Sequence, residues 1–242
     1  MKLSGKTAVI TGGGTGIGWG IAQCLAAEGC RVVIAGRREE PLREAATQWK
    51  GAPITWHCVD VTDRESVAAL ATWAHKELGH VDILVNSAGT NIKTRTMAAM
   101  LPAQWDEVMA INATGVYNCM YAFLPGMRER KDGLIVNVSS TSGKRAAPLG
   151  GVAYDASKFA VTALTTATWN EEAPNGIRIT NVFPGEVDTP ILEKRPTPVS
   201  AERRATMLRP TDVGEMVVAI ALLPARAHVP EIIIKPLVQE FI

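Results

Sequence analysis

Short apolar runs rich in β-branched residues alternate with longer amphipathic stretches along almost the whole chain. The runs predict strands at Thr7–Thr11, Arg31–Ala35, Ile54–Cys58, Asp82–Asn86, Leu134–Ser139, Arg178–Phe183 and Glu231–Lys235. The stretches between them predict helices at Gly18–Glu28, Glu39–Trp49, Arg64–Leu78, Ala103–Arg130, Ala153–Glu172 and Thr211–Leu223. Apolar strands separated by helices indicate βαβ units and a parallel sheet that is covered on both faces. We therefore expect an α/β fold, a doubly wound parallel sheet of about seven strands in a single domain.

Composition and charge narrow the classes of function. The 242 residues are 47% apolar and 20% charged, as in ordinary globular proteins. Lys and Arg total 25 against 24 for Asp and Glu, so the net charge is only +1. This balance argues against nucleic acid or an anionic membrane surface as a partner. No stretch approaches the roughly 20 apolar residues that span a bilayer, and the apolar run Thr7–Ile10 is too short for a signal peptide.

The cysteines and histidines indicate neither a disulfide framework nor a metal site. Cys24, Cys30, Cys58 and Cys119 form no Cys-x-x-Cys pair and lie within apolar periodic segments. We expect them to be buried thiols of a protein in a reducing, cytoplasmic compartment. The histidines are scattered without the spacing of metal ligands, so no metal is expected.

A glycine-rich segment joins the first predicted strand to the first predicted helix. Its pattern is Thr11-Gly12-x-x-x-Gly16-x-Gly18. Glycine lets the backbone turn sharply and lets a pyrophosphate approach where a Cβ would obstruct it. The helix start presents free N–H groups and its positive dipole end to such a phosphate. The order of strand, glycines and helix favours a dinucleotide site over a turn without a ligand, although the spacing is not Gly-x-Gly-x-x-Gly.

Six motifs in order resemble those of the short-chain dehydrogenase/reductase family, across nearly the whole chain. They are the glycine segment, Asn86-Ser87-Ala88-Gly89, Trp105-Asp106-x-Val108-Met109-x-Ile111-Asn112, Ser139-Ser140, Tyr154-x-x-x-Lys158 and Asn181-x-x-Pro184-Gly185-x-x-x-Thr189. The resemblance implies a Rossmann-type fold and an oxidoreductase that transfers a hydride between a nicotinamide cofactor and a CH–OH group. Ser87 departs from the Asn that is usual in the family, and we expect only a small structural adjustment there.

Three polar residues predict the proton chemistry. Tyr154 and Lys158 lie four apart on a predicted helix, so they share a face. A nearby ammonium lowers the pKa of a phenol from its usual value near 10 toward the range that proton transfer needs. Ser140 follows the fifth predicted strand, at the edge where open sheets bind ligands, and its hydroxyl would hold the substrate oxygen. The alternatives are a surface Tyr–Lys pair and a serine that only ends the strand.

Asn112 is the fourth candidate catalytic residue. It lies inside a predicted helix, where Asn is unfavourable, which is consistent with a kink and a bound water; a solvated Asn is the alternative. The resemblance implies that Asn112 supports a water relay to Lys158, which also binds the nicotinamide ribose. It further implies, with the glycine segment, the following cofactor contacts: Gly12, Thr15, Gly16, Ile17, Gly18, Asp60, Val61, Asn86, Ala88, Gly89, Tyr154, Lys158, Pro184, Gly185, Val187 and Thr189.

The end of the second predicted strand indicates which nicotinamide cofactor is used. An acidic residue there would accept from the ribose 2′-hydroxyl and repel a 2′-phosphate. The chain instead has Ala35-Gly36-Arg37-Arg38. Arg37 and Arg38 can form charge-assisted bonds to a phosphate, which favours NADP over NAD. The alternative is that both arginines only form the solvated start of the next helix.

The motifs do not name the substrate. We expect its pocket to be lined by Lys144, Arg145, Leu149, Gly150, Glu186 and Val187, and closed by a lid at Pro190–Pro210. The excess of Lys and Arg in this lid favours small hydroxy or keto acids, against the alternative of a merely solvated lid. The segment Ala225-Arg-Ala-His-Val-Pro-Glu-Ile-Ile-Ile-Lys-Pro-Leu237 resembles that of the branch that oxidises 3-hydroxy acids and serine-like alcohols with NADP. A 3-ketoacyl or general carbonyl reductase remains open, as does a catalytically silent NADP(H)-binding sensor.

The resemblance also implies a homotetramer. Family members commonly pair the helices that correspond to Ala103–Arg130 and Ala153–Glu172 across one axis, and the last strand, here Glu231–Lys235, across another. The tail is apolar at Leu237, Val238, Phe241 and Ile242, which suggests that it is buried. The alternative is that the tail folds back onto its own chain.

Overall fold

A parallel seven-stranded sheet forms the centre of the computed structural model, which describes residues 1–239. The strand order is β3-β2-β1-β4-β5-β6-β7, and every neighbouring pair is parallel. The strands are β1 (Thr7–Thr11), β2 (Arg31–Gly36), β3 (Thr55–Cys58), β4 (Ile83–Asn86), β5 (Gly133–Val138), β6 (Ile177–Pro184) and β7 (Glu231–Ile234). The predicted doubly wound fold is confirmed, because the chain winds outward from β1 to β3 and then crosses back to β4 beside β1.

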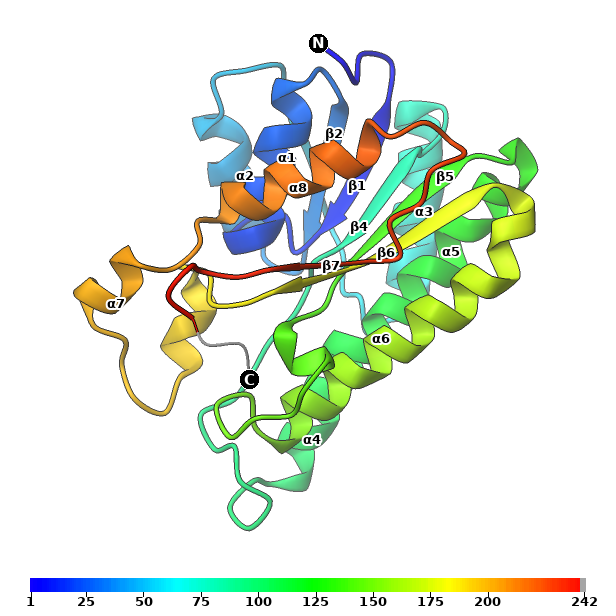
Figure 1. The fold of residues 1–242 in the computed structure, drawn as a ribbon. Coiled ribbons are helices and arrows are strands. Elements are labelled where there is room, and N and C mark those ends of the chain that lie inside the picture. Colours follow the sequence, from blue (N-terminus) through cyan, green and yellow to red (C-terminus); the bar gives the residue numbers. More distant parts are fainter. Residues whose placement is uncertain (240–242) are drawn as a thin grey trace.

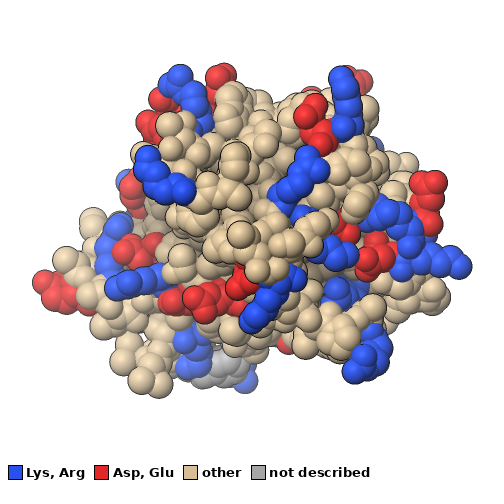
Figure 2. All heavy atoms as spheres, turned by 90° about the horizontal axis from the view of Figure 1, so that it is seen from above, with Lys and Arg blue, Asp and Glu red and all other residues tan. Residues whose placement is uncertain are grey.

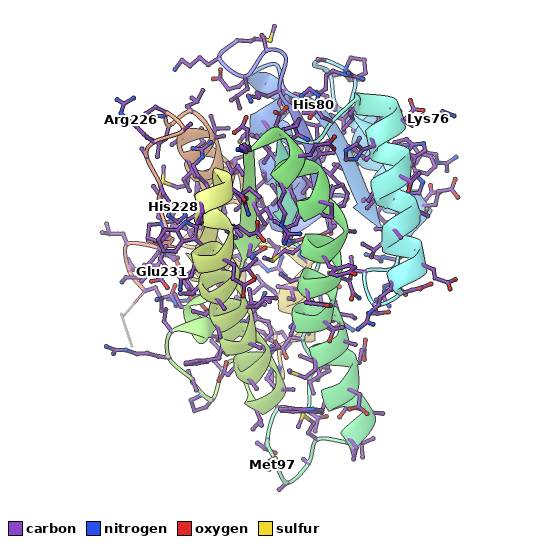
Figure 3. All side chains as sticks on the ribbon, turned by 90° about the vertical axis from the view of Figure 1, so that its right-hand side faces the viewer. Lys76, His80, Met97, Arg226, His228 and Glu231 are labelled. Carbon is purple, nitrogen blue, oxygen red and sulfur yellow. The ribbon has the colours of Figure 1, made fainter. Side chains whose placement is uncertain are left out.

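Helices cover both faces of the sheet (Figure 1). One layer consists of α1 (Gly16–Ala27), α2 (Glu39–Gln48) and α8 (Pro210–Ala221), whose apolar sides pack with β1 and β2 in one core. The other layer consists of α3 (Arg64–Leu78), α5 (Gly115–Arg130) and α6 (Val152–Glu172), which lie side by side in Figure 3. Both faces of the central strands are therefore buried, which explains why β1, β4 and β5 read as continuous apolar runs.

The long helix predicted at Ala103–Arg130 is present, but one turn in its middle is wider than an α-helical turn. The structure has α4 (Pro102–Met109), a π-helical turn (Ala110–Thr114) and then α5, without a break between them. Such wide turns are rare and often mark functional sites. Asn112 lies in this turn and is fully buried, so the solvated alternative is excluded.

The predicted lid is more ordered than its sequence suggests. It contains a 3₁₀ helix (Pro190–Lys194) and a short helix, α7 (Ala201–Ala205). Its arginines bind acidic residues next to β6. Arg195 pairs with Glu186 at 2.7 Å, Arg203 pairs with the other oxygen of Glu186, and Arg204 pairs with Asp188 at 3.2 Å. Three of the lid cations that were expected to favour acidic substrates are therefore paired with carboxylates of the same chain.

Two of the four cysteines depart from the predicted burial. All four are free thiols, and Cys30 and Cys119 are buried as predicted. Cys24 is only partly buried, and Cys58 is exposed at the end of the edge strand β3. On the face shown in Figure 2, acidic and basic side chains are interspersed. Within residues 1–239, no helix combines the length and the apolar character that crossing a membrane requires.

The apolar tail lies only partly within the described residues. Leu237 is 99% exposed and Val238 is exposed as well, while Phe241 and Ile242 lie outside the described residues. Gln239 folds back onto the chain, where its Oε1 accepts from the backbone N–H of Glu186 at 2.9 Å.

Candidate active site

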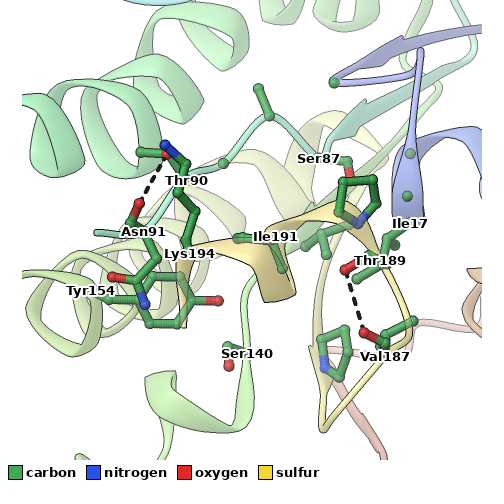
Figure 4. A pocket seen from close by; sticks show the side chains of 18 of the residues that line it. Ile17, Ser87, Thr90, Asn91, Ser140, Tyr154, Val187, Thr189, Ile191 and Lys194 are labelled. Atoms are coloured by element: carbon green, nitrogen blue, oxygen red, sulfur yellow. Dashed lines mark hydrogen bonds between the residues drawn. The ribbon is translucent and has the colours of Figure 1, made fainter. Parts of the chain in front are cut away.

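A cavity of about 710 Å³ opens at the carboxyl ends of the strands. It extends from the end of β2, past the glycine segment, to the start of α6, and the 3₁₀ helix Pro190–Lys194 lies over it (Figure 4). Open parallel sheets bind ligands at this edge, where the chain changes its winding direction. In this protein that point lies between β1 and β4.

The glycine segment is shaped by close backbone approach. Gly12 has a φ of 66°, and a Cβ on it would lie 2.8 Å from the Cα of Ala88. A Cβ on Gly18 would collide with the backbone oxygen of Gly12. Thr11 fixes the opposite loop, because its hydroxyl accepts from the backbone N–H groups of Ser87 and Ala88, each at 3.3 Å. The first turn of α1 is left open toward the cavity, as phosphate binding requires.

Tyr154 and Lys158 come from the first two turns of α6, and both line the cavity. The Lys158 Nζ lies 5.6 Å from the centre of the Tyr154 ring and donates to the carbonyl oxygen of Val138 at 2.9 Å. Ser140 lies opposite, just after β5. Its Oγ accepts from the backbone N–H of Ser142 at 3.1 Å, which orients the hydroxyl and leaves its own O–H as a donor.

The pKa of Tyr154 is not lowered by Lys158 as the sequence predicts. Burial raises the pKa of the Tyr154 phenol, although hydrogen bonding with Ser140 and the charge of Arg95 oppose this rise. Burial also lowers the pKa of Lys158 to about 8. The prediction that Lys158 holds the phenol pKa down is therefore wrong here, because the ammonium bonds to a backbone carbonyl and is not among the groups that shift Tyr154.

Asn112 lies behind the cavity and holds the loop that follows β4. Its Oδ1 accepts from the backbone N–H of Thr90 at 2.8 Å, and its Nδ2 donates to the Thr90 carbonyl at 3.0 Å. The same Nδ2 donates to the hydroxyl of Ser157 on α6 at 3.0 Å. This amide thus ties the loop after β4 to the helix that carries Tyr154 and Lys158.

Most of the predicted cofactor contacts line the cavity. These are Gly12, Thr15, Gly16, Ile17, Gly18, Arg37, Arg38, Val61, Ala88, Gly89, Tyr154, Lys158, Pro184, Gly185, Val187 and Thr189. Asn86 and Asp60 do not. Asn86 donates to the Asn137 side chain at 2.8 Å within the sheet. The Asp60 carboxylate is held by Thr62, whose backbone N–H and hydroxyl donate to it at 2.9 and 2.7 Å.

Five of the six residues predicted to line the substrate pocket do line the cavity. Arg145, Leu149, Gly150, Glu186 and Val187 line the cavity. Lys144 does not line it, so this prediction is wrong. Its ammonium pairs with Glu231 on β7 and lies 4.6 Å from the centre of the Phe183 ring on β6.

Sequence reasoning missed several residues that line the cavity. Arg95 and Thr90 come from the loop between β4 and α4, and Gln239 comes from the tail. No motif marks them, because their positions depend on how distant segments fold together. Among the described residues, no cluster of three or more His, Cys, Asp or Glu side chains is arranged to hold a metal ion.

Comparison with known proteins decides the family. Residues 6–199 match the sequence profile of the short chain dehydrogenase family. The chain belongs to the short-chain dehydrogenase/reductase family. The predicted membership and the predicted oxidoreductase class are thereby confirmed. An uncharacterized oxidoreductase of Staphylococcus saprophyticus is 34% identical over 98% of this chain and 99% of its own length.

Solved structures of this family resemble the chain closely. A metagenomic short-chain oxidoreductase in complex with NADP is 31% identical, with a TM-score of 0.84 over 99% of this chain and 100% of its own. The closed form of a serine dehydrogenase complexed with NADP⁺ is 27% identical, with a TM-score of 0.89 over 97% of this chain and 96% of its own.

Proposed function

We propose that this short-chain dehydrogenase/reductase is an NADP(H)-dependent enzyme that interconverts a small alcohol and the corresponding carbonyl compound. The observation that carries the proposal is the arrangement of one cavity. Tyr154, Lys158 and Ser140 meet at one end of it, and the glycine segment with Arg37 and Arg38 forms the other. A site with an acid–base end and a phosphate-binding end suits a dinucleotide redox enzyme.

The residues present fit a nicotinamide dinucleotide. The glycine segment leaves space that a Cβ would fill, and the open N–H groups of α1 suit a pyrophosphate. Gly89, Pro184, Gly185 and Thr189 would hold the nicotinamide end. When bound, the cofactor supplies or accepts the hydride.

Arg37 and Arg38 support NADP as the cofactor. Both line the cavity at the end of β2, where no carboxylate follows the strand. The charge of Arg37 also acts on Asp60. Burial raises its pKa, but bonds from Thr62 and the charge of Arg37 outweigh this and hold the pKa below its usual range. Two guanidinium groups at this point suit a 2′-phosphate, and the NADP-bound relatives support the same choice.

The side chains of this protein would then move the proton. During reduction Tyr154 donates its phenolic proton to the carbonyl oxygen, and the raised pKa keeps that proton in place at neutral pH. The hydroxyl of Ser140, which also bonds with Tyr154, would donate to the same oxygen as negative charge develops on it. Lys158, which lines the cavity beside the Tyr154 ring, would hold the nicotinamide ribose.

Within this class we propose a substrate that carries a carboxylate, such as a small 3-hydroxy acid. Eight Lys or Arg residues and three Glu residues line the described part of the cavity, in a chain whose net charge is only +1. We further propose a cytoplasmic homotetramer. Its contacts would include the exposed aromatic side chains of Tyr117, Tyr121 and Phe159 on α5 and α6.

Oxidation of NADPH in the presence of a panel of aldehydes, ketones and keto acids tests the proposed function. Tyr154→Phe is expected to lower turnover by about 10²–10⁴-fold, because it removes the proton donor. NADPH binding, followed by fluorescence titration, should stay close to that of the wild type. A mutant that keeps more than a tenth of the rate would show that another group delivers the proton. A wild type that binds NADPH but reduces nothing would instead be a binding-only sensor.

A further inference from the structure

The cations that line the cavity are not equivalent. Arg37 and Arg38 lie at the cofactor end, and Lys158 belongs to the proton chemistry. Arg195 pairs at 2.7 Å with Glu186, which also pairs with Arg203. Arg145 and Lys235 also line the cavity and have interactions of their own. Arg95 and Lys194 lie toward the end that holds Tyr154, and within residues 1–239 neither of them forms an ion pair with a carboxylate.

Arg95 is built into its position rather than free on the surface. Its Nε donates to the carbonyl of Ile92 at 2.9 Å, its Nη1 donates to the carbonyl of Leu149, and its Nη2 donates to the carbonyl of Lys194 at 2.9 Å. All three acceptors are neutral, so these bonds orient the guanidinium without cancelling its charge. A guanidinium has five N–H donors, so two remain for a ligand.

The start of α6 is packed against Arg95. The backbone N–H of Val152 donates to the Arg95 carbonyl at 3.1 Å. Gly151 has a φ of 84°, and a Cβ on it would lie 2.5 Å from the Arg95 Cβ. Arg95 is thus fixed at the first turn of the 21-residue helix that carries Tyr154, where the helix dipole also favours an anion.

Lys194 approaches from the lid. Its backbone carbonyl is the acceptor for Arg95, and its side chain extends past Tyr154 toward Thr90 and Asn91 in Figure 4. Both cations therefore line the cavity near Tyr154, where the carbonyl would react. Glu107 and Glu193 also line the cavity, and Asp155 acts on Arg95 from the first turn of α6, but Ala147 N–H already donates to the Asp155 carboxylate at 2.8 Å.

Arg95 is partly buried, and a partly buried cation without a paired carboxylate is unfavourable. Burial, and next the charge of Arg195, lower the pKa of Arg95, which shows that the surroundings penalise its positive charge. A bound anion would relieve that penalty, and it would do so beside Tyr154.

We propose that Arg95 and Lys194 form an anion subsite that holds the carboxylate of the substrate while its carbinol or carbonyl group lies at Tyr154 and Ser140. This inference rests on the proposed function and assigns its acid selectivity to these two residues. Arg203 and Arg204 also belong to the lid, but they pair with Glu186 and Asp188 and are not part of the subsite. A guanidinium and an ammonium can together hold both carboxylate oxygens through charge-assisted hydrogen bonds.

Ligand-detected NMR titration of the protein saturated with NADPH tests the subsite without turnover, because 3-hydroxybutyrate and NADPH cannot react with each other. The probes are 3-hydroxybutyrate and its methyl ester, which differ in charge. In the wild type the acid should bind about tenfold or more tighter than the ester, as expected for charged hydrogen bonds. Titrations without NADPH show whether the subsite needs the cofactor.

Four variants separate the subsite from general charge effects. Lys194→Met removes an exposed ammonium while it keeps the backbone carbonyl that Arg95 needs, and it should abolish the advantage of the acid. Arg95→Met should do the same, whereas Arg95→Lys keeps a cation and should retain part of the advantage. Lys93→Met is the matched control, because Lys93 is exposed on the same loop but does not line the cavity. It should leave the advantage unchanged.

The outcomes distinguish this inference from the proposed function. Equal affinity for acid and ester in the wild type, or an unchanged advantage in both Lys194→Met and Arg95→Met, would overturn the subsite. An equal loss in Lys93→Met would also overturn it, since long-range attraction would then be the cause. In each case NADPH-dependent reduction of neutral ketones would still uphold the oxidoreductase. Conversely, Lys194-dependent binding of the acid with no turnover of any carbonyl compound would uphold the subsite and refute the enzyme.

Discussion

The side-chain amide of Asn112 bonds to both backbone groups of Thr90, at 2.8 Å to its N–H and 3.0 Å to its carbonyl. A peptide group in a sheet is satisfied by a neighbouring strand, but this loop has left the sheet after β4. Asn112 provides the missing partner from a π-helical turn. The loop that contains Thr90 and Asn91 is thereby held against the start of α6, which keeps one wall of the cavity in place.

Asn112→Asp should destabilise the protein. The carboxylate keeps the acceptor for Thr90 N–H but replaces the two-donor amide nitrogen by an oxygen facing the Thr90 carbonyl. A buried, unsatisfied polar group costs about 1–3 kcal/mol, and more when it is charged. Urea denaturation at pH 7 should show a free energy of unfolding lower by at least that amount. Asn170→Asp, on the exposed side of α6, is the matched control and should change little.

The rate of carbonyl reduction should fall as the pH rises through about 8. Burial lowers the pKa of Lys158 to about 8, so its ammonium is charged below that pH and neutral above it. Tyr154, whose pKa is raised, keeps its proton across the same range. The pH profile of kcat/KM for NADPH reports the free enzyme and should show this alkaline limb.

Lys158→Arg checks the assignment of that limb. A guanidinium stays charged throughout the accessible range, so the limb at about pH 8 should disappear even if the overall rate is lower. If the limb persists unchanged in this variant, Lys158 is not the group that titrates.

Arg37→Ala should raise KM for NADPH by roughly tenfold or more, because a charged hydrogen bond contributes about 1.5–3 kcal/mol. KM for NADH, which lacks the 2′-phosphate, should barely change. Arg43→Ala is the control, since Arg43 pairs with Glu40 on α2 and does not line the cavity. A wild type that uses NADH as well as NADPH would contradict the assignment of NADP.

Light scattering is expected to give a mass about four times the 25.9 kDa of one chain. Tyr121 on α5 is 70% exposed and its ring stacks on that of Tyr117 at 5.9 Å, so a charge there should disrupt a helix-mediated contact. Tyr121→Glu should therefore produce a smaller species. Met97→Glu is the control, because Met97 is equally exposed but lies on a loop beyond the ends of these helices (Figure 3). A wild-type monomer at micromolar concentration would refute the tetramer.

Local sequence pattern was sufficient for the sheet. The seven predicted strands agree with the structure to within one residue at every end, because each is a short run rich in β-branched residues. The inner strands are buried on both faces, whereas the edge strands β3 and β7 are partly exposed. The glycine segment could be predicted as well, because Gly12 approaches the Ala88 backbone so closely that no side chain would fit. The π-helical turn at Asn112 was visible only as an unfavourable residue in a helix. Its bonding to Thr90 depends on a segment 22 residues away.

Charge was the property that sequence reasoning predicted least well. Counting cations in the lid could not reveal that Glu186 pairs with both Arg195 and Arg203, or that Lys144 pairs with Glu231. The two cations that we assign to substrate binding differ in origin, since Lys194 belongs to the lid and Arg95 does not. Such pairings are set by tertiary contacts between distant segments, which periodicity and spacing do not encode.

Glu186 also constrains how this enzyme can change its substrate. One carboxylate, 8% exposed, holds two arginines from different parts of the lid. Replacing the lid by that of a relative would leave a buried charge without a partner unless position 186 changed as well. Evolution of a new specificity should therefore proceed through coordinated substitutions at positions 186, 195 and 203. A library that varies these three positions together should yield more folded variants than one that varies the lid alone.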